Sequence, residues 1–324
     1  MLSIFFFLIL GGQFICIQGW GADGHSIIAR LAESELTDSA SKWIRSLVPW
    51  HFDGNLSAMA SWADSIIHQN SNPTGFDNWK WSKPLHYLNI PDWNCTYHVN
   101  RDCINNICID GAIRNYTERL QNNLDLVQQQ EALYFLIHFV GDIHQPLHTA
   151  FSSDFGGNSI EVRFMNDTKK TNLHSLWDSG IIKYHMKNDF QSNVNNYYEY
   201  IYKLMIRESK PNDDDDNQTQ QWVKESLNYV CNDIYFDDRN RTLNTDGTYN
   251  LNRNYYIRSR AIIEKRLAQG GRRLGALLNR IEQNRATPMT SKTSLTLVPN
   301  ILINVACVVT ILIVIFSDFS MHSM

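Results

Sequence analysis

The chain has 324 residues, of which 43% are hydrophobic and 19% are charged. This much apolar surface can bury a large core, which excludes a disordered tail or a low-complexity scaffold. The formal net charge is −4, from 29 basic and 33 acidic residues, which argues against a nucleic-acid binder that relies on clustered Lys and Arg. A phosphate-handling protein of this composition needs positive charge from another source, and bound metal is the obvious one.

The first 19 residues contain a short apolar run at residues 4–10. This run is too short to span a bilayer, so residues 1–19 are predicted to be a secretory signal peptide. Cleavage after Gly19 would make Trp20 the new N-terminus. The residues that follow, 20–285, have the length of one large domain.

Helical periodicity dominates this domain, and its predicted helices cover residues 24–35, 128–143, 172–186, 194–208 and 251–282. Strand signals are few. Residues 158–164 alternate in polarity after Gly156 and Gly157, which predicts one arm of a small β-hairpin. The expected fold class is therefore a mainly α-helical single domain with a small β-hairpin.

A second apolar segment, residues 295–316, approaches the ~20 residues needed to cross hydrocarbon. Residues 286–294 are rich in Thr and Ser and are interpreted as a stalk, and residues 317–324 form a short tail. The tail has no Lys or Arg, so the usual orientation signal is missing. Two interpretations stay open: a transmembrane anchor, and a lipid-anchor signal that is removed.

Six glycosylation sequons lie in the domain, at Asn55, Asn94, Asn115, Asn166, Asn217 and Asn240. Together with the signal peptide they predict the secretory pathway, with a membrane-anchored domain on the extracellular or lumenal side. The domain also has four cysteines, namely Cys95, Cys103, Cys108 and Cys231. Four cysteines allow two disulfides in three pairings, which spacing does not rank.

Two His-x-x-x-Asp pairs fall on predicted helices, His138 with Asp142 and His174 with Asp178. A separation of four residues is about 40° of rotation on a helix, so both side chains of a pair leave one face. One such pair is more often a helix-stabilising hydrogen bond than a metal site. Two pairs on apolar, buried helices are costly unless they bind metal, and imidazole with carboxylate is a zinc ligand set.

Other candidate ligands surround these pairs. His148 follows the first pair and can fold back toward it from a turn, whereas His25, Asp64 and His86 lie upstream. Each upstream residue also has a simpler interpretation. His25 could be a helix-terminus histidine, Asp64 a surface acid or cap, and His86 a core histidine in an edge strand.

The candidates occur as the ordered motifs Trp20-Gly-Ala-Asp-Gly-His25, Trp62-Ala-Asp64, Pro84-Leu-His86-Tyr87, His138-x3-Asp142-x5-His148 and His174-x3-Asp178. In this order and spacing the chain resembles the zinc-dependent class I nucleases, the single-strand nucleases and 3′-nucleotidases of fungi, plants and protists. The resemblance covers most of residues 20–281. It implies a mainly helical fold, shared with bacterial zinc phospholipases C, around three zinc ions.

The resemblance also implies a role for each candidate ligand. One zinc ion is held by the residues that match the family's first ligand set, Asp64, His86, His138 and Asp142. The second is held by His148, His174 and Asp178. The third is held by the amine and carbonyl of Trp20, with His25 and the shared Asp142, so the site is complete only after signal cleavage. The implied disulfides are Cys95–Cys231 and Cys103–Cys108.

The implied activity is hydrolysis of single-stranded DNA and RNA to 5′-phosphate products, with 3′-nucleotidase activity, by a monomer. The chemistry is metal-assisted hydrolysis in which Asp64 orients the attacking water. Tyr87 matches the family's base-stacking position, and Asn158 matches a contact near the phosphate; the alternatives are a core tyrosine and a turn residue. Asn89 replaces an acid that contacts the base in many members, so base preference does not carry over.

Two other functions stay open, and a departure from the family pattern motivates one of them. Many members have Arg three residues after the metal-binding acid, and this chain has Ile67. A non-catalytic surface adhesion protein that keeps zinc for stability is one alternative, although stability alone does not need three metal sites with open positions. A zinc phospholipase C-like enzyme is the other, although the Gly156-Gly157-Asn158 loop and the paired cysteines resemble nucleases more.

Overall fold

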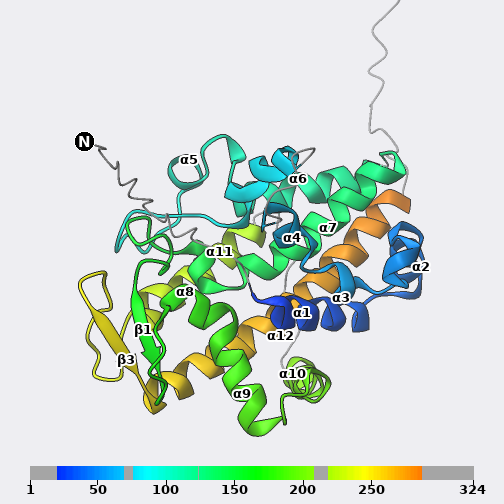
Figure 1. The fold of residues 1–324 in the computed structure, drawn as a ribbon. Coiled ribbons are helices and arrows are strands. Elements are labelled where there is room, and N and C mark those ends of the chain that lie inside the picture. Colours follow the sequence, from blue (N-terminus) through cyan, green and yellow to red (C-terminus); the bar gives the residue numbers. More distant parts are fainter. Residues whose placement is uncertain (1–19, 69–75, 123, 208–217, 287–324) are drawn as a thin grey trace, which may run out of the picture. The chain divides into compact units, whose positions relative to one another are not determined.

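The computed structural model describes residues 20–68, 76–122, 124–207 and 218–286 (Figure 1). The chain divides into two units, Met1–Thr287 and Pro288–Met324. The predicted signal peptide, the C-terminal apolar segment and the sequon at Asn217 lie outside the described residues, as does the predicted stalk apart from its first residue. Within the described ranges, no helix is both long enough and apolar enough to cross a membrane.

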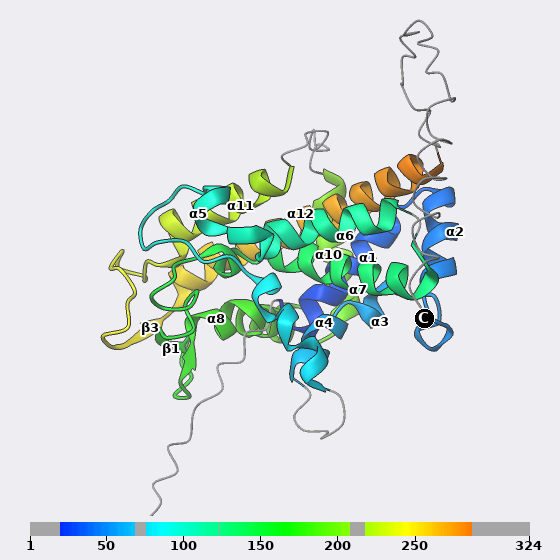
Figure 2. The ribbon, with the colours of Figure 1, turned by 90° about the horizontal axis from the view of Figure 1, so that it is seen from above.

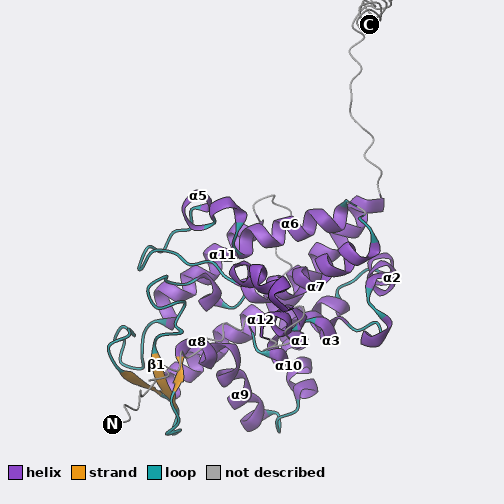
Figure 3. Cartoon of the chain, turned by 45° about the horizontal axis from the view of Figure 1, so that its top comes forward, coloured by secondary structure: helices purple, strands orange, loops and turns teal. Residues whose placement is uncertain are grey.

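Helices make up most of the described structure (Figure 3). The α-helices are α1 (Ala22–Ser34), α2 (Asp38–Leu47), α3 (Leu56–Met59), α4 (Trp62–His68), α5 (Val99–Asp102), α6 (Ile109–Gln121), α7 (Leu126–Ile143), α8 (Leu173–Ser175), α9 (Ile181–Asp189), α10 (Val194–Arg207), α11 (Gln218–Tyr229) and α12 (Arg253–Ala286). Short 3₁₀ turns are η1 (Trp50–Phe52), η2 (Phe76–His86), η3 (Ile104–Asn106) and η4 (Pro146–Thr149), and π-helical turns are η5 (Leu176–Gly180) and η6 (Val230–Ile234).

The predicted helices are present, with one change. The helix expected over residues 172–186 is divided into α8, the π-helical turn η5 and α9. A π turn has no distinctive residue composition, because it is a local insertion into an α-helix. This turn contains Asp178, so it places one of the predicted ligands.

The centre of the domain is α7, which packs beside α6 and α12 (Figure 2). Every residue from Ala132 to Ile143 is buried, as expected of a helix that is apolar all round. Helix α12 also packs closely on α1, because a Cβ atom at Gly271 would lie 2.3 Å from the Leu31 Cβ atom. The polar His138 and Asp142 of α7 are therefore held in the interior between rigid helices.

The sheet has three strands rather than the two of the predicted hairpin. β1 (Glu161–Phe164) pairs antiparallel with β2 (Thr171–Asn172), which is the expected hairpin. β3 (Thr248–Leu251) pairs in parallel on the other side of β1, with Thr248 opposite Glu161. Its four residues, Thr-Tyr-Asn-Leu, alternate in polarity, but so short a run is a weak strand signal. Its partner strand is far away in the sequence, so β3 was not predicted.

A short parallel pairing joins the segments that follow His86 and His148. The Leu88 N–H donates to the His148 carbonyl (2.8 Å), and the Ile90 N–H donates to the Ala150 carbonyl (3.0 Å). Two disulfides, Cys95–Cys231 and Cys103–Cys108, connect residues that follow Ile90 in the sequence. These are the two pairings that the resemblance implies.

Candidate metal centre

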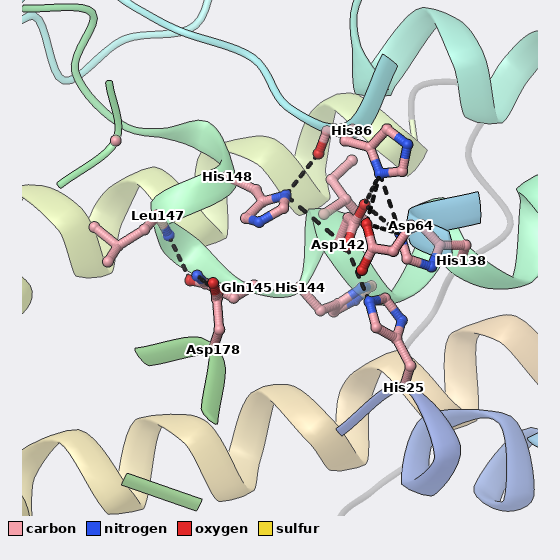
Figure 4. A network of polar contacts seen from close by, with 12 residues as sticks. His25, Asp64, His86, His138, Asp142, His144, Gln145, Leu147, His148 and Asp178 are labelled. Carbon is pink, nitrogen blue, oxygen red and sulfur yellow. Dashed lines mark hydrogen bonds and ion pairs between the residues drawn. The ribbon is translucent and has the colours of Figure 1, made fainter. Parts of the chain in front are cut away.

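Eight of the predicted ligand side chains form three buried groups, and Figure 4 shows how His25, His86 and His138 face Asp142. In each group, one ligand atom from each residue lies within 4.8 Å of the others. The groups are His25, His138 and Asp142; Asp64, His86 and His138; and His148, His174 and Asp178. The structure therefore brings together residues that are up to 153 positions apart in the sequence (178 minus 25).

Seven different elements supply these side chains. His25 is in the first turn of α1, Asp64 is in α4, and His86 ends η2. The ligand candidates of α7 lie one helical turn apart near its C-terminal end. The remaining candidates come from the short elements that follow, namely His148 from η4, His174 from α8 and Asp178 from η5.

Asp142 lies at the centre of this arrangement and is fully buried. Its Oδ1 atom is 3.1 Å from His25 Nε2 and 3.9 Å from His148 Nδ1. Its Oδ2 atom is 3.0 Å from His86 Nδ1 and 3.1 Å from His138 Nε2. One carboxylate thus lies within 4 Å of a histidine from each of the three clusters.

Backbone carbonyls fix the orientation of three histidine rings. The Nδ1–H of His138 donates to the Ala60 carbonyl (2.8 Å) and that of His148 to the His86 carbonyl (2.6 Å). The Nδ1–H of His174 donates to the Gly156 carbonyl (2.7 Å). In the neutral form of each ring, protonated Nδ1 leaves the lone pair on Nε2, which is the usual preparation of a zinc-binding histidine.

The donor atoms of Asp64, His86 and His138 are better arranged to bind a cation than to bind one another. His138 Nε2 and His86 Nδ1 are 3.1 Å apart, and the Asp64 Oδ1 atom lies 3.4 and 3.6 Å from them. Burial alone would lower the pKa of His138, but the carboxylates of Asp142 and Asp64 raise it well above its ordinary value. The cluster therefore attracts positive charge, and its N and O donors are those that zinc prefers.

The cluster of His148, His174 and Asp178 also needs a positive charge to stabilise its buried carboxylate. Burial raises the pKa of Asp178 well above its ordinary range, although a hydrogen bond from the Gln145 side chain (Nε2 to Oδ1, 2.6 Å) opposes that shift. A buried carboxylate is costly without a cation or donors. Gln145 was missed by the sequence analysis, because a lone glutamine beside proline carries no ligand pattern.

Trp20 is fully buried next to these elements. The Gly21 N–H donates to the Asp178 carbonyl (2.9 Å). A Cβ atom at Gly24 would lie 2.8 Å from the Trp20 Cβ atom, so this glycine allows the indole to pack. The start of the predicted mature chain is therefore held against the turn that contains Asp178.

The predicted substrate-contacting residues occupy two neighbouring segments. Tyr87 and Asn89 are half-buried and follow His86, whereas Asn158 is buried and donates from Nδ2 to the Phe155 carbonyl (2.8 Å). Phe155 was not among the residues predicted from the sequence. Its side chain is 52% exposed and its backbone φ is +55°, which is uncommon for a bulky residue and is often a functional feature.

Sequence similarity to known proteins agrees with a metal-dependent site of this kind. The chain matches the S1/P1 nuclease family over residues 20–283. It is 38% identical to Endonuclease 4 of Arabidopsis thaliana over 81% of this chain and 89% of that protein. It is 36% identical to Endonuclease 2 of Arabidopsis thaliana, over 82% and 91% of the two chains. It is 28% identical to Nuclease S1 of Aspergillus oryzae, over 81% and 92%.

The chain therefore belongs to the S1/P1 nuclease family. It is an S1/P1-type nuclease and thus a hydrolase, and the family resemblance found in the sequence is confirmed. Its three buried His/Asp clusters are consistent with the three zinc ions of this family.

Proposed function

We propose that the chain hydrolyses phosphodiester bonds in single-stranded DNA and RNA to 5′-phosphate products, and that it removes phosphate from 3′-nucleotides. The observation that carries this proposal is the set of three buried clusters joined through Asp142. A nuclease with a net charge of −4 needs the positive charge that metal ions supply at a phosphate.

The proposed ligand sets are those of the family resemblance, and the three clusters support them. Asp64, His86, His138 and Asp142 would hold one zinc ion, and His148, His174 and Asp178 would hold a second. The Trp20 amine and carbonyl, with His25 and Asp142, would hold the third. Bound zinc supplies an acidified water and a positive charge for the departing oxygen.

Asp64 is the proposed residue that orients the attacking water. Its side chain is 10% exposed, whereas the side chain of Asp142 is fully buried. Burial alone would raise the pKa of Asp64, but the charge and hydrogen bond of His138 hold it below its ordinary value. Asp64 is thus an ionised carboxylate and the most exposed acid of the three clusters, where it can orient a water molecule by accepting its hydrogen bond.

The remaining proposals concern the ends and the surface of the chain. Residues 1–19 are proposed to be a signal peptide, whose removal frees the Trp20 amine. Residues 20–285 would be the nuclease domain, with the fold of zinc phospholipases C. Residues 286–294 would be a stalk and residues 295–316 a transmembrane or lipid anchor, followed by a tail at 317–324. Two disulfides and five described sequons with exposed or half-buried Asn residues support the secretory route. The protein is proposed to act as a monomer.

Unpaired bases are proposed to stack on Tyr87 and on the exposed ring of Phe155. The Phe155 loop lies beside a metal cluster, because the next residue, Gly156, accepts the hydrogen bond from His174. Half-buried Tyr87 directly follows His86. Such stacking would favour single strands, because bases in a duplex are already stacked on one another.

Phe155→Gly is expected to raise KM for a single-stranded oligonucleotide about tenfold, because stacking on an aromatic ring contributes about 1–3 kcal/mol per base. The protein should be no less stable, since glycine adopts positive φ without strain. Steady-state kinetics and thermal unfolding measure the two effects. Gln191→Gly is the control, as Gln191 is exposed and has the same φ of +55°. An unchanged KM in Phe155→Gly would contradict the stacking role.

The proposed function is tested with single-stranded DNA, RNA and 3′-AMP, with and without a zinc chelator. Cleavage is expected to fall about a thousandfold or more with the chelator and to return when zinc is added back, because metal ions contribute several kcal/mol to such reactions. His138→Ala should behave like the chelated protein, and His51→Ala, at an exposed position, like the wild type.

Two other outcomes would contradict the proposal. Zinc-loaded protein that cleaves phosphatidylcholine but no nucleic acid would be a phospholipase C-like enzyme. Zinc-loaded protein with no turnover of any of these substrates would support the adhesion alternative.

A further inference from the structure

A second buried polar cluster lies at the C-terminal end of α7, outside the three metal-binding groups. Arg266 and Arg273 come from α12 and Glu225 comes from α11. They meet His144, which caps α7 and is fully buried. His144 lies two residues after Asp142 and four residues before His148.

Arg266 binds the end of the helix backbone. It is fully buried, and its Nε–H donates to the His144 carbonyl (3.3 Å). Its Nη2–H donates to Ser226 Oγ (2.7 Å), whose hydroxyl donates to the Ile143 carbonyl (2.7 Å). Carbonyls in the last turn of a helix have no partner within the helix and carry partial negative charge, so a buried guanidinium here stabilises the end of α7.

Arg273 fixes the His144 ring. Its Nη1–H points at His144 Nε2 (3.2 Å), while the His144 Nδ1–H donates to the Val140 carbonyl (2.8 Å). A guanidinium can only donate, so His144 Nε2 accepts from Arg273 while its Nδ1–H donates to its own helix.

Glu225 holds the two guanidinium groups together. It accepts from Arg273 twice (2.6 and 2.9 Å) and from Arg266 once (2.9 Å). Burial alone would raise the pKa of Glu225, but hydrogen bonds and charges from both arginines keep it lower than usual. Burial lowers the pKa of Arg266 to about 10, so it is still charged at neutral pH.

We propose that Arg266, Arg273 and Glu225 are positioning residues that hold the end of α7 and thereby keep Asp142 and His148 at the separation that two different metal ions require. This inference rests on the ligand roles proposed above. The cluster touches the backbone and the ring of His144, which lies between these two ligands in the sequence, and it contributes no atom to the metal groups. Supporting residues of this kind typically change metal affinity about 10–100-fold when they are replaced.

The test compares Arg273→Gln with Arg272→Gln in the full-length chain from a eukaryotic secretory host. Arg272 is a matched control, because it is a buried arginine next in the same helix that donates instead to the Met205 carbonyl of α10. Zinc affinity is measured by competition with a chromogenic chelator, and zinc content by elemental analysis. Arg273→Gln should bind at least one zinc ion about 10–100-fold more weakly, while Arg272→Gln should bind zinc as the wild type does.

Wild-type zinc affinity in Arg273→Gln, or an equal loss in Arg272→Gln, would overturn the proposal. If Arg273→Gln fails to fold, Arg273→Lys replaces it, because lysine keeps the charge but cannot hold Glu225 and His144 together. Arg273→Lys should also bind zinc more weakly than the wild type, and an unchanged affinity would overturn the proposal. Because zinc binding needs no substrate, a wild-type protein that binds zinc without cleaving nucleic acid would contradict the proposed function alone.

Discussion

Asp142→Asn is expected to lower kcat/KM on single-stranded DNA by about a thousandfold or more, because metal ions contribute several kcal/mol to hydrolysis. Asp142 lies within 4 Å of histidines of all three clusters, so zinc content should fall from the three ions per chain proposed above toward one. Burial alone would raise the pKa of Asp142, but charges and hydrogen bonds from its histidines hold it well below the ordinary value. Asparagine keeps the shape of this side chain but lacks its negative charge.

Elemental analysis and initial rates measure both effects. Asp189→Asn is the matched control, since Asp189 also lies four residues after a buried histidine, with Oδ2 2.7 Å from His185 Nδ1. It belongs to none of the metal groups found among the described residues, so zinc content and rate should stay at wild-type values. An Asp142→Asn protein that retained three zinc ions would contradict the central role of Asp142.

Removal of the Cys95–Cys231 disulfide by a double Cys→Ser substitution should lower the free energy of unfolding by about 5 kcal/mol. The disulfide closes a loop with a sequence separation of 136, and the denatured chain gains conformational entropy when a long loop opens. This loss is half or more of the stability of many domains. The variant is therefore expected to secrete poorly at 37 °C.

The other disulfide is the matched control, because Cys103–Cys108 has a sequence separation of only 5. Its removal should lower the free energy of unfolding by about 2 kcal/mol, from the same dependence on loop length. Denaturant unfolding at equal zinc concentration measures the difference between the two double variants. Equal losses would show that loop closure is not the main contribution of these bonds.

Helices were predicted correctly where the hydrophobic periodicity lies within one continuous stretch of sequence. The expected helices over residues 128–143 and 194–208 correspond to α7 and α10. Strand β3 was missed, since its four residues become a strand only by pairing with β1. The π turn η5 was also missed, because its geometry reflects packing rather than composition.

The candidate ligands could be predicted from sequence, whereas the groups that support them could not. All eight predicted side-chain ligands lie in the three clusters. The carbonyls of Ala60 and Gly156 orient two of the rings, yet any residue can supply a carbonyl, so no sequence signal marks them. Arg266 and Arg273 reach His144 across more than 120 positions of sequence, which a helical pattern on α12 does not reveal.

The sequence by itself determined the helical class, the candidate ligands and the family, because helical period and ligand chemistry depend on residue type and short spacings. Only the tertiary structure decided which His-x-x-x-Asp pairs join a metal cluster. His185 and Asp189 have the same spacing and a buried histidine, but His185 Nδ1 faces Asp189 (2.7 Å) while Nε2 faces Glu264 (3.0 Å). These carboxylates lie on opposite sides of the ring and cannot share one ion, whereas α1, α4, η2 and α7 bring the ligands around Asp142 to a common point.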